Sequence, residues 1–155
     1  MYFIDIKGLK KDIIEKNFTE SNRFTYMMVY LLLDAFFMEI CSYLPSDSMP
    51  TIIDYAISLI TLISLFLGAY FIFKANGGNK GEDFAGRFFS LTWVRSIQFL
   101  LITIPIIFLL GILNESVLHL SDLNAEIAYF VLYSSFLFAI YYYAYRDVLE
   151  IRGES

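Results

Sequence analysis

Four long apolar stretches dominate this chain of 155 residues, at about 24–44, 51–74, 88–113 and 125–145. A helix needs roughly 20 apolar residues to cross a hydrocarbon core about 30 Å thick, and each stretch is long enough. The chain is 58% hydrophobic and 17% charged, whereas average soluble domains are about 45–50% apolar and about 25% charged. The connections are too short for a separate soluble domain. We therefore predict one membrane domain over residues 1–155.

The apolar stretches are expected to be helices rather than strands of a barrel. Barrel strands are about ten residues long and alternate in polarity, whereas these stretches are longer and apolar on all sides. Lipid offers no partner for free backbone groups, so each span must satisfy its own. The predicted fold class is therefore all-α, a polytopic antiparallel bundle of four transmembrane helices.

The basic residues predict the orientation of the spans. Ten of the eleven Lys and Arg residues flank the stretches on one predicted side, and the connections at about 45–50 and 114–124 contain none. Basic residues are enriched on the cytoplasmic side of membrane proteins. Both termini are therefore expected in the cytoplasm, with the bacterial inner membrane as the expected location.

Residues 1–23 form a polar segment before the first stretch. Apolar residues recur at helical spacing from Ile6 to Ile13, and the basic side chains point elsewhere: Lys10, Lys11 and Lys16. This pattern predicts a short amphipathic helix on the cytoplasmic interface. It serves either as a surface anchor for the first span or as a docking helix for a cytoplasmic protein.

The connections carry two local signals. The short connection at 45–50 predicts that the first two spans are antiparallel neighbours. After it, Thr51 and Asp54 have the spacing of a capping box, so Asp54 is interpreted as a helix cap, with a place on an ion path as the alternative. Ser64 and Gly68 form a small-x-x-x-small pair that would allow close helix approach.

The loop at 75–83 is rich in glycine. Its Gly77 and Gly78 are suited to a flexible reversal, and successive glycines also form anion-holding nests. Together with Lys80 and Arg87, they are candidate contacts for a cytoplasmic partner or a lipid headgroup. The spacing excludes a Walker A loop.

Three charged residues lie inside the predicted spans, away from the span ends: Asp34, Glu39 and Arg95. Such groups are costly in lipid, usually face the bundle interior and often mark function. Asp34 costs about 3 kcal/mol on insertion scales and Glu39 adds a smaller penalty, and together they nearly cancel the gain of about 4–5 kcal/mol from the apolar residues of the first span. That span should therefore benefit from a partner for Asp34.

Arg95 is the predicted partner of Asp34. At about 1.5 Å per residue, Asp34 lies about 16 Å deep and Arg95 about 12 Å deep on parallel spans. Gln98 and Tyr30 share the helix faces of Arg95 and Asp34 and could complete a buried polar cluster. The cluster is interpreted as a structural ion pair that selects which helices meet. The alternative is an ion or proton path that includes Glu39 and Asp54.

The sequence favours a non-catalytic subunit. It contains no recognisable catalytic arrangement, and one Cys and one His cannot form a zinc site. We expect no metal, cofactor or nucleic acid, but a lipid bilayer and either self-association or a cytoplasmic protein partner. Membrane anchors, sensors and factors of bacterial defence or toxin immunity share this shape, which is an analogy of architecture only. The alternative function is a homo-oligomeric ion channel that uses the intramembrane carboxylates.

Overall fold

The computed structural model describes residues 2–43, 51–114 and 121–154, and within these ranges the chain is helical without a strand. Its elements are α1 (Ile6–Ile14), α2 (Glu20–Tyr43), α3 (Ile52–Ala75), the 3-10 turn η1 (Gly78–Lys80), α4 (Phe84–Leu113) and α5 (Asp122–Glu154). The all-helical prediction is confirmed. The predicted connections at 45–50 and 114–124 lie largely outside the described residues.

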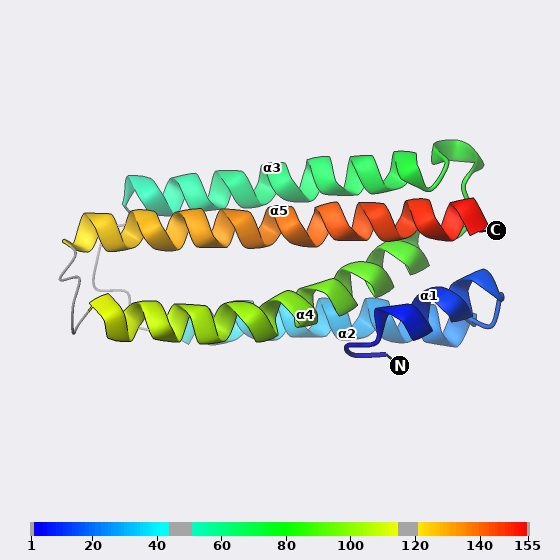
Figure 1. The fold of residues 1–155 in the computed structure, drawn as a ribbon, viewed down its shortest axis with the longest axis horizontal. Helices are drawn as coiled ribbons and strands as arrows, with labels where there is room; N and C mark the ends of the chain where they lie inside the picture. Colours follow the sequence, from blue (N-terminus) through cyan, green and yellow to red (C-terminus); the bar gives the residue numbers. More distant parts are fainter. Residues whose placement is uncertain (1, 44–50, 115–120, 155) are drawn as a thin grey trace.

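The four long helices lie along one axis and alternate in direction (Figure 1). Helix α3 packs against α5, α2 packs against α4, and α4 also packs against α5. The prediction that the first two spans are neighbours is wrong, because α2 and α3 each pack mainly against a helix that is distant in sequence. The chain termini lie at one end of the molecule.

Three helices are long and apolar enough to cross a membrane: Ile52–Ala75, Phe84–Leu113 and Leu123–Gly153. In α4, none of the most apolar window is buried inside the protein. Large exposed side chains such as Leu101, Ile104 and Phe108 cover this part of α4. A contiguous apolar surface of this extent is rare on soluble proteins and is typical of contact with lipid. The chain is therefore an integral membrane protein.

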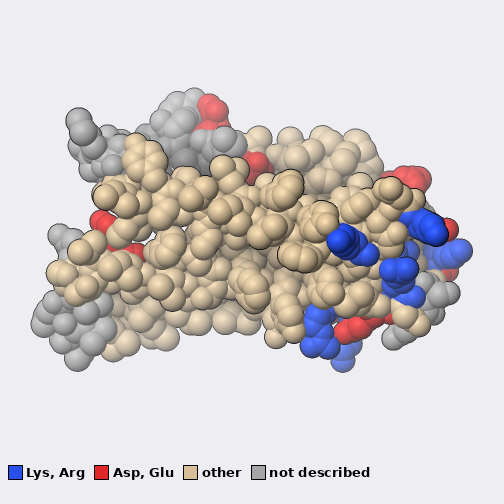
Figure 2. Space-filling view, turned by 90° about the horizontal axis from the view of Figure 1, so that it is seen from above, with Lys and Arg blue, Asp and Glu red and all other residues tan. Residues whose placement is uncertain are grey.

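The hydrophobic core lies at the end that carries both termini. Its buried residues come from α1, the start of α2, the end of α3, the first turns of α4 and the end of α5, and they include Leu9, Tyr26, Ile72, Leu91 and Val148. Lys and Arg side chains gather at the same end, whereas most of the elongated remainder is uncharged (Figure 2). We call residues 2–26, 72–95 and 140–154 the basic end.

The basic end exists because α4 and α5 are longer than the apolar stretches that revealed them. Helix α4 begins at Phe84 and α5 continues to Glu154, whereas the predicted spans began near 88 and ended near 145. The part of α5 beyond the predicted span continues an apolar stripe of the helix. In this stripe Ala144, Val148 and Ile151 are fully buried. The two helices thus extend past their most apolar windows and pack there against α1.

The start of α3 has the predicted capping box. The Thr51 hydroxyl accepts from the Asp54 backbone N–H at 3.2 Å, and the Asp54 carboxylate accepts from the Thr51 N–H at 2.7 Å. These bonds satisfy two backbone donors that a helix start leaves free. Asp54 therefore acts as a helix cap.

Candidate functional site

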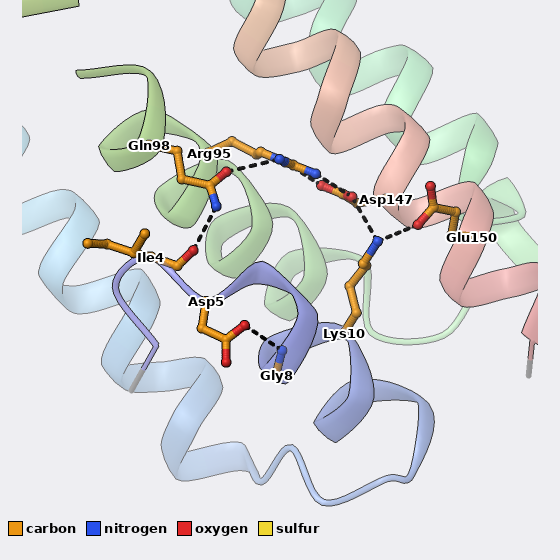
Figure 3. A network of polar contacts seen from close by, with 8 residues as sticks. All are labelled: Ile4, Asp5, Gly8, Lys10, Arg95, Gln98, Asp147 and Glu150. Carbon is orange, nitrogen blue, oxygen red and sulfur yellow. Dashed lines mark hydrogen bonds and ion pairs between the residues drawn. The ribbon is translucent and has the colours of Figure 1, made fainter. Parts of the chain in front are cut away.

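A polar network joins α1, α4 and α5 within the basic end (Figure 3). The guanidinium of Arg95 on α4 donates to both carboxylate oxygens of Asp147 on α5, at 2.6 and 2.7 Å. Asp147 is 1% exposed. Such paired, charge-assisted hydrogen bonds fix the orientation of the two groups as well as their separation. The network therefore fixes how α4 meets α5.

Lys10 brings α1 into the same network. Its ammonium lies 3.3 Å from an Asp147 carboxylate oxygen and also donates to Glu150. Burial lowers the pKa of Lys10, but the hydrogen bond to Glu150 and the attraction of Asp147 outweigh it and raise the pKa above its usual value. Two cations thus face two carboxylates, and the cluster is electrically balanced.

Gln98 extends the network to the N-terminal segment that precedes α1. Its side-chain oxygen accepts from Arg95 at 2.9 Å, and its amide nitrogen donates to the backbone carbonyl of Ile4 at 2.7 Å. One residue later, the Asp5 carboxylate caps α1 by accepting from the Gly8 N–H at 2.9 Å. The segment before α1 is therefore held at the Ile4 carbonyl by Gln98 and at Asp5 by the cap of α1.

The predicted partner of Arg95 needs correction. In the structure the carboxylate at Arg95 is Asp147, whereas Asp34 is exposed on α2 and has no ion pair among the described residues. The depth estimate placed Arg95 within the hydrocarbon by counting from Arg87. The first turns of α4, however, belong to the buried core, so Arg95 lies where that core ends and the exposed apolar helix begins.

Of the other two residues of the predicted polar cluster, one lies in the Arg95 network and one does not. Gln98 bonds to Arg95 as the helix spacing predicted. Tyr30 is not part of the network, and its ring packs edge-on against Phe89 of α4 with the centroids 5.5 Å apart. Glu39, like Asp34, is exposed on α2.

The amphipathic segment is a helix, but its apolar face is used inside the protein. Leu9 and Ile13 are buried in the core against α4 and α5. Of the three lysines, Lys10 joins the network, while Lys11 and Lys16 are exposed and Lys11 lies 3.8 Å from Glu15. Contact of α1 with the membrane surface stays a prediction.

The glycine-rich loop is built around a buried amide. Asn76 is 3% exposed; its side chain accepts from Arg87 at 2.8 Å and donates to the Glu82 carbonyl at 3.0 Å. A Cβ at Gly81 would lie 2.1 Å from the Asn76 carbonyl oxygen, so only glycine fits there. Gly77 and Gly78 have φ of 104° and 59°, which L side chains rarely adopt. The loop is thus closed on itself, and Lys80 is exposed on it.

Asp147 is the network residue that the sequence interpretation missed. It lies beyond the apolar stretch that defined the last span, so it was not counted among the ionisable residues of interest. The available signal was its place within an apolar stripe at helical spacing, formed by Ile140, Ala144 and Ile151. A carboxylate on such a stripe is buried and requires a cationic partner.

The fold and the network together describe a membrane protein that is helical in its described residues and whose basic end is held by the Arg95–Asp147 ion pair. Among the described residues, no group of three or more His, Cys, Asp or Glu side chains is placed to hold a metal ion. Comparisons with protein-family models, with curated proteins and with solved structures find no match for the chain.

Proposed function

We propose that this protein is a non-catalytic, self-associating subunit of the bacterial inner membrane, with four spans and both termini in the cytoplasm. One observation carries the proposal. The core and the ion network occupy the basic end, while the apolar helices leave most of their surface exposed. The chain thus consists of the packed basic end and a set of membrane helices whose exposed apolar surface is available for contacts with further helices.

Helix α2 is the proposed fourth span. It is 24 residues long, the same length as α3, and lies along the same axis as the other long helices. The orientation is supported by the basic residues that gather at the end with both termini. Cytoplasmic flanks of membrane helices carry this excess of Lys and Arg.

Asp34 supports self-association. It is exposed on α2, next to exposed apolar side chains such as Leu32 and Leu33. A carboxylate in the middle of a span costs about 3 kcal/mol on insertion scales, and polar side chains in spans commonly hydrogen-bond across helices. Contact with a second copy would give Asp34 an ion-pair or hydrogen-bond partner that the described residues do not supply.

The test is the oligomeric state of the full chain in nanodiscs across a range of protein-to-lipid ratios. We expect an oligomer that Asp34→Leu weakens by about tenfold, since one interhelical hydrogen bond is worth about 1–2 kcal/mol. The control Leu32→Ala changes an exposed apolar neighbour and should shift the equilibrium little. A wild-type chain that stays monomeric at every ratio would refute self-association and leave a cytoplasmic partner at the basic end.

An ion channel is the second candidate, and exposed Asp34 and Glu39 on α2 favour it. Rings of carboxylates select cations, and four helices of one chain leave little room for a pore, so copies would have to enclose it. Purified protein in planar bilayers should then conduct, and Asp34→Asn should change selectivity. Absence of current across ions and voltages would exclude this function.

A further inference from the structure

A polar cavity of about 390 Å³ lies at the basic end, apart from the Arg95 network. It is lined by five basic residues, which come from the segment after α1 and from α2, η1, α4 and α5: Lys16, Arg23, Lys80, Arg87 and Arg152. Two acidic residues, Glu82 and Asp83, also line it. Five positive charges therefore face two negative ones around one cavity.

Neighbouring groups compensate part of this excess, since Arg23 is ion-paired and Arg152 donates to the Ala75 carbonyl at 3.3 Å. The partners of Arg23 are Asp83, at 2.8 Å, and Glu20. Within the described ranges, Lys16, Lys80 and Arg87 have no ion pair. Like charges held close together repel one another, and an anion in the cavity would relieve that repulsion.

Arg87 provides an independent sign of a missing acceptor. Its Nη1 donates to Asn76 at 2.8 Å, which fixes the side chain at the cavity wall. Its Nε is buried and has no hydrogen-bond partner among the described residues. A buried donor without an acceptor costs free energy, and the guanidinium is held at the cavity wall with this donor unsatisfied.

The wall of the cavity is fixed by packing. Asn76 holds Arg87 and the Glu82 carbonyl together, and Gly81 allows the loop to close on the Asn76 backbone. On either side of this loop in the sequence, Phe73 of α3 and Phe84 of α4 pack their rings edge-on, with the centroids 5.4 Å apart. The cationic cavity thus begins where the apolar end of α3 turns back into α4.

We propose that this cavity binds a phosphate group carried by an anionic phospholipid headgroup. Guanidinium groups match the oxygens of a phosphate, and lysines add charge without a fixed geometry. The cavity has the size of a small-ligand site. A lipid is the favoured source because the cavity adjoins the apolar helices, and clustered Lys and Arg next to membrane spans attract anionic headgroups.

The test measures lipid binding to the full chain by native mass spectrometry in a neutral detergent, with phosphatidylglycerol as the probe. The double variant Lys16→Gln/Lys80→Gln removes two cavity cations that are exposed and make no side-chain bond within the described residues, so folding is retained. We expect it to weaken binding about tenfold or more, because both lysines would face the bound phosphate. Arg87→Gln is a second variant and should act in the same direction.

The matched control is Lys7→Gln/Lys11→Gln, which removes two charges from the same end but outside this cavity. Binding within about twofold of wild type is expected for it, since neither of these lysines lines the cavity. Equal loss in both double variants, or no loss in either, would overturn the site. Glycerol 3-phosphate distinguishes the source: if it binds as tightly as the lipid, the phosphate site stands but a soluble phosphate compound, not a headgroup, is its ligand.

Discussion

Asp147 links three helices through one carboxylate. It is buried on α5, accepts two hydrogen bonds from Arg95 of α4 and lies next to Lys10 of α1. Placing charges in a protein interior costs solvation, and the cost is recovered only when every charge is paired with good geometry. The bidentate contact meets that condition, so its main effect is to select one packing of these helices.

We expect Asp147→Asn to destabilise the protein by about 3–5 kcal/mol, because it leaves the Arg95 guanidinium without its counter-charge at the edge of the core. The measurement is thermal or denaturant-induced unfolding in a defined detergent. Glu150→Gln is the control, since Glu150 is exposed and its ion-pair partner in the described part of the chain is Lys10, and it should cost less than about 1 kcal/mol. A cost for Asp147→Asn no greater than that of the control would show that the buried pair is unimportant.

The sequence indicated which polar residues matter more reliably than it indicated which residues they contact. The importance of Arg95 and its bond to Gln98 followed from polarity and helix spacing. Its carboxylate partner did not, because the choice depends on where the core ends along α4. That boundary is set by tertiary packing of α1 and α5 and has no mark in the apolar stretch itself. Asp54 was predictable because a capping box is local.

Helix α1 is attached to the bundle by packing and by charge. Its Leu9 is fully buried in the core, and its Lys10 reaches Asp147 and Glu150 on α5. The sequence predicted the amphipathic helix, because its period is local. It did not reveal that the apolar face packs on protein, because helix α5 supplies that surface only beyond its predicted end.

The attachment of α1 should weaken at high pH. The pKa of Lys10 is raised in the folded protein, so its contribution is complete below the ordinary value of 10.5 and is lost as pH rises through the higher folded value. Amide hydrogen exchange in α1, corrected for intrinsic rates, should show protection falling in that window. Lys10→Arg keeps its charge there and should extend protection to higher pH. If the two proteins lose protection together, deprotonation of Lys10 is not the cause.

The contact between α3 and α5 depends on a glycine. A Cβ at Gly68 would lie 2.4 Å from the ring of Tyr141, near its attachment, where the side chain has little freedom to move away. Gly68→Ala should therefore push the helices apart and cost about 1–3 kcal/mol. Gly111→Ala on α4 meets nothing within 4 Å and should be neutral or slightly stabilising, because Ala favours helices. Unfolding in detergent measures both; equal stability of the two variants would contradict the close approach.

At the scale of the molecule, polarity is divided along the long axis. The buried core, the ion network and the cationic cavity all lie at the basic end, and the exposed apolar surfaces of α3, α4 and α5 occupy the remainder. This division was predictable in outline from the apolar stretches and the basic flanks. The packing of the basic end was not, because it is assembled from three stretches that are far apart in the sequence.

Whether α2 crosses the membrane can be decided by labelling two positions on either side of it. In a Cys41→Ser background, Lys11→Cys and Ile52→Cys place thiols at exposed positions before and after α2. If α2 is a span, an impermeant maleimide added to intact spheroplasts should label position 52 only, and inverted vesicles should expose position 11. If both positions react from the same face, α2 lies on the membrane surface and the chain has three spans. Because the basic residues surround position 11, its labelling from inside would also establish that the basic end faces the cytoplasm.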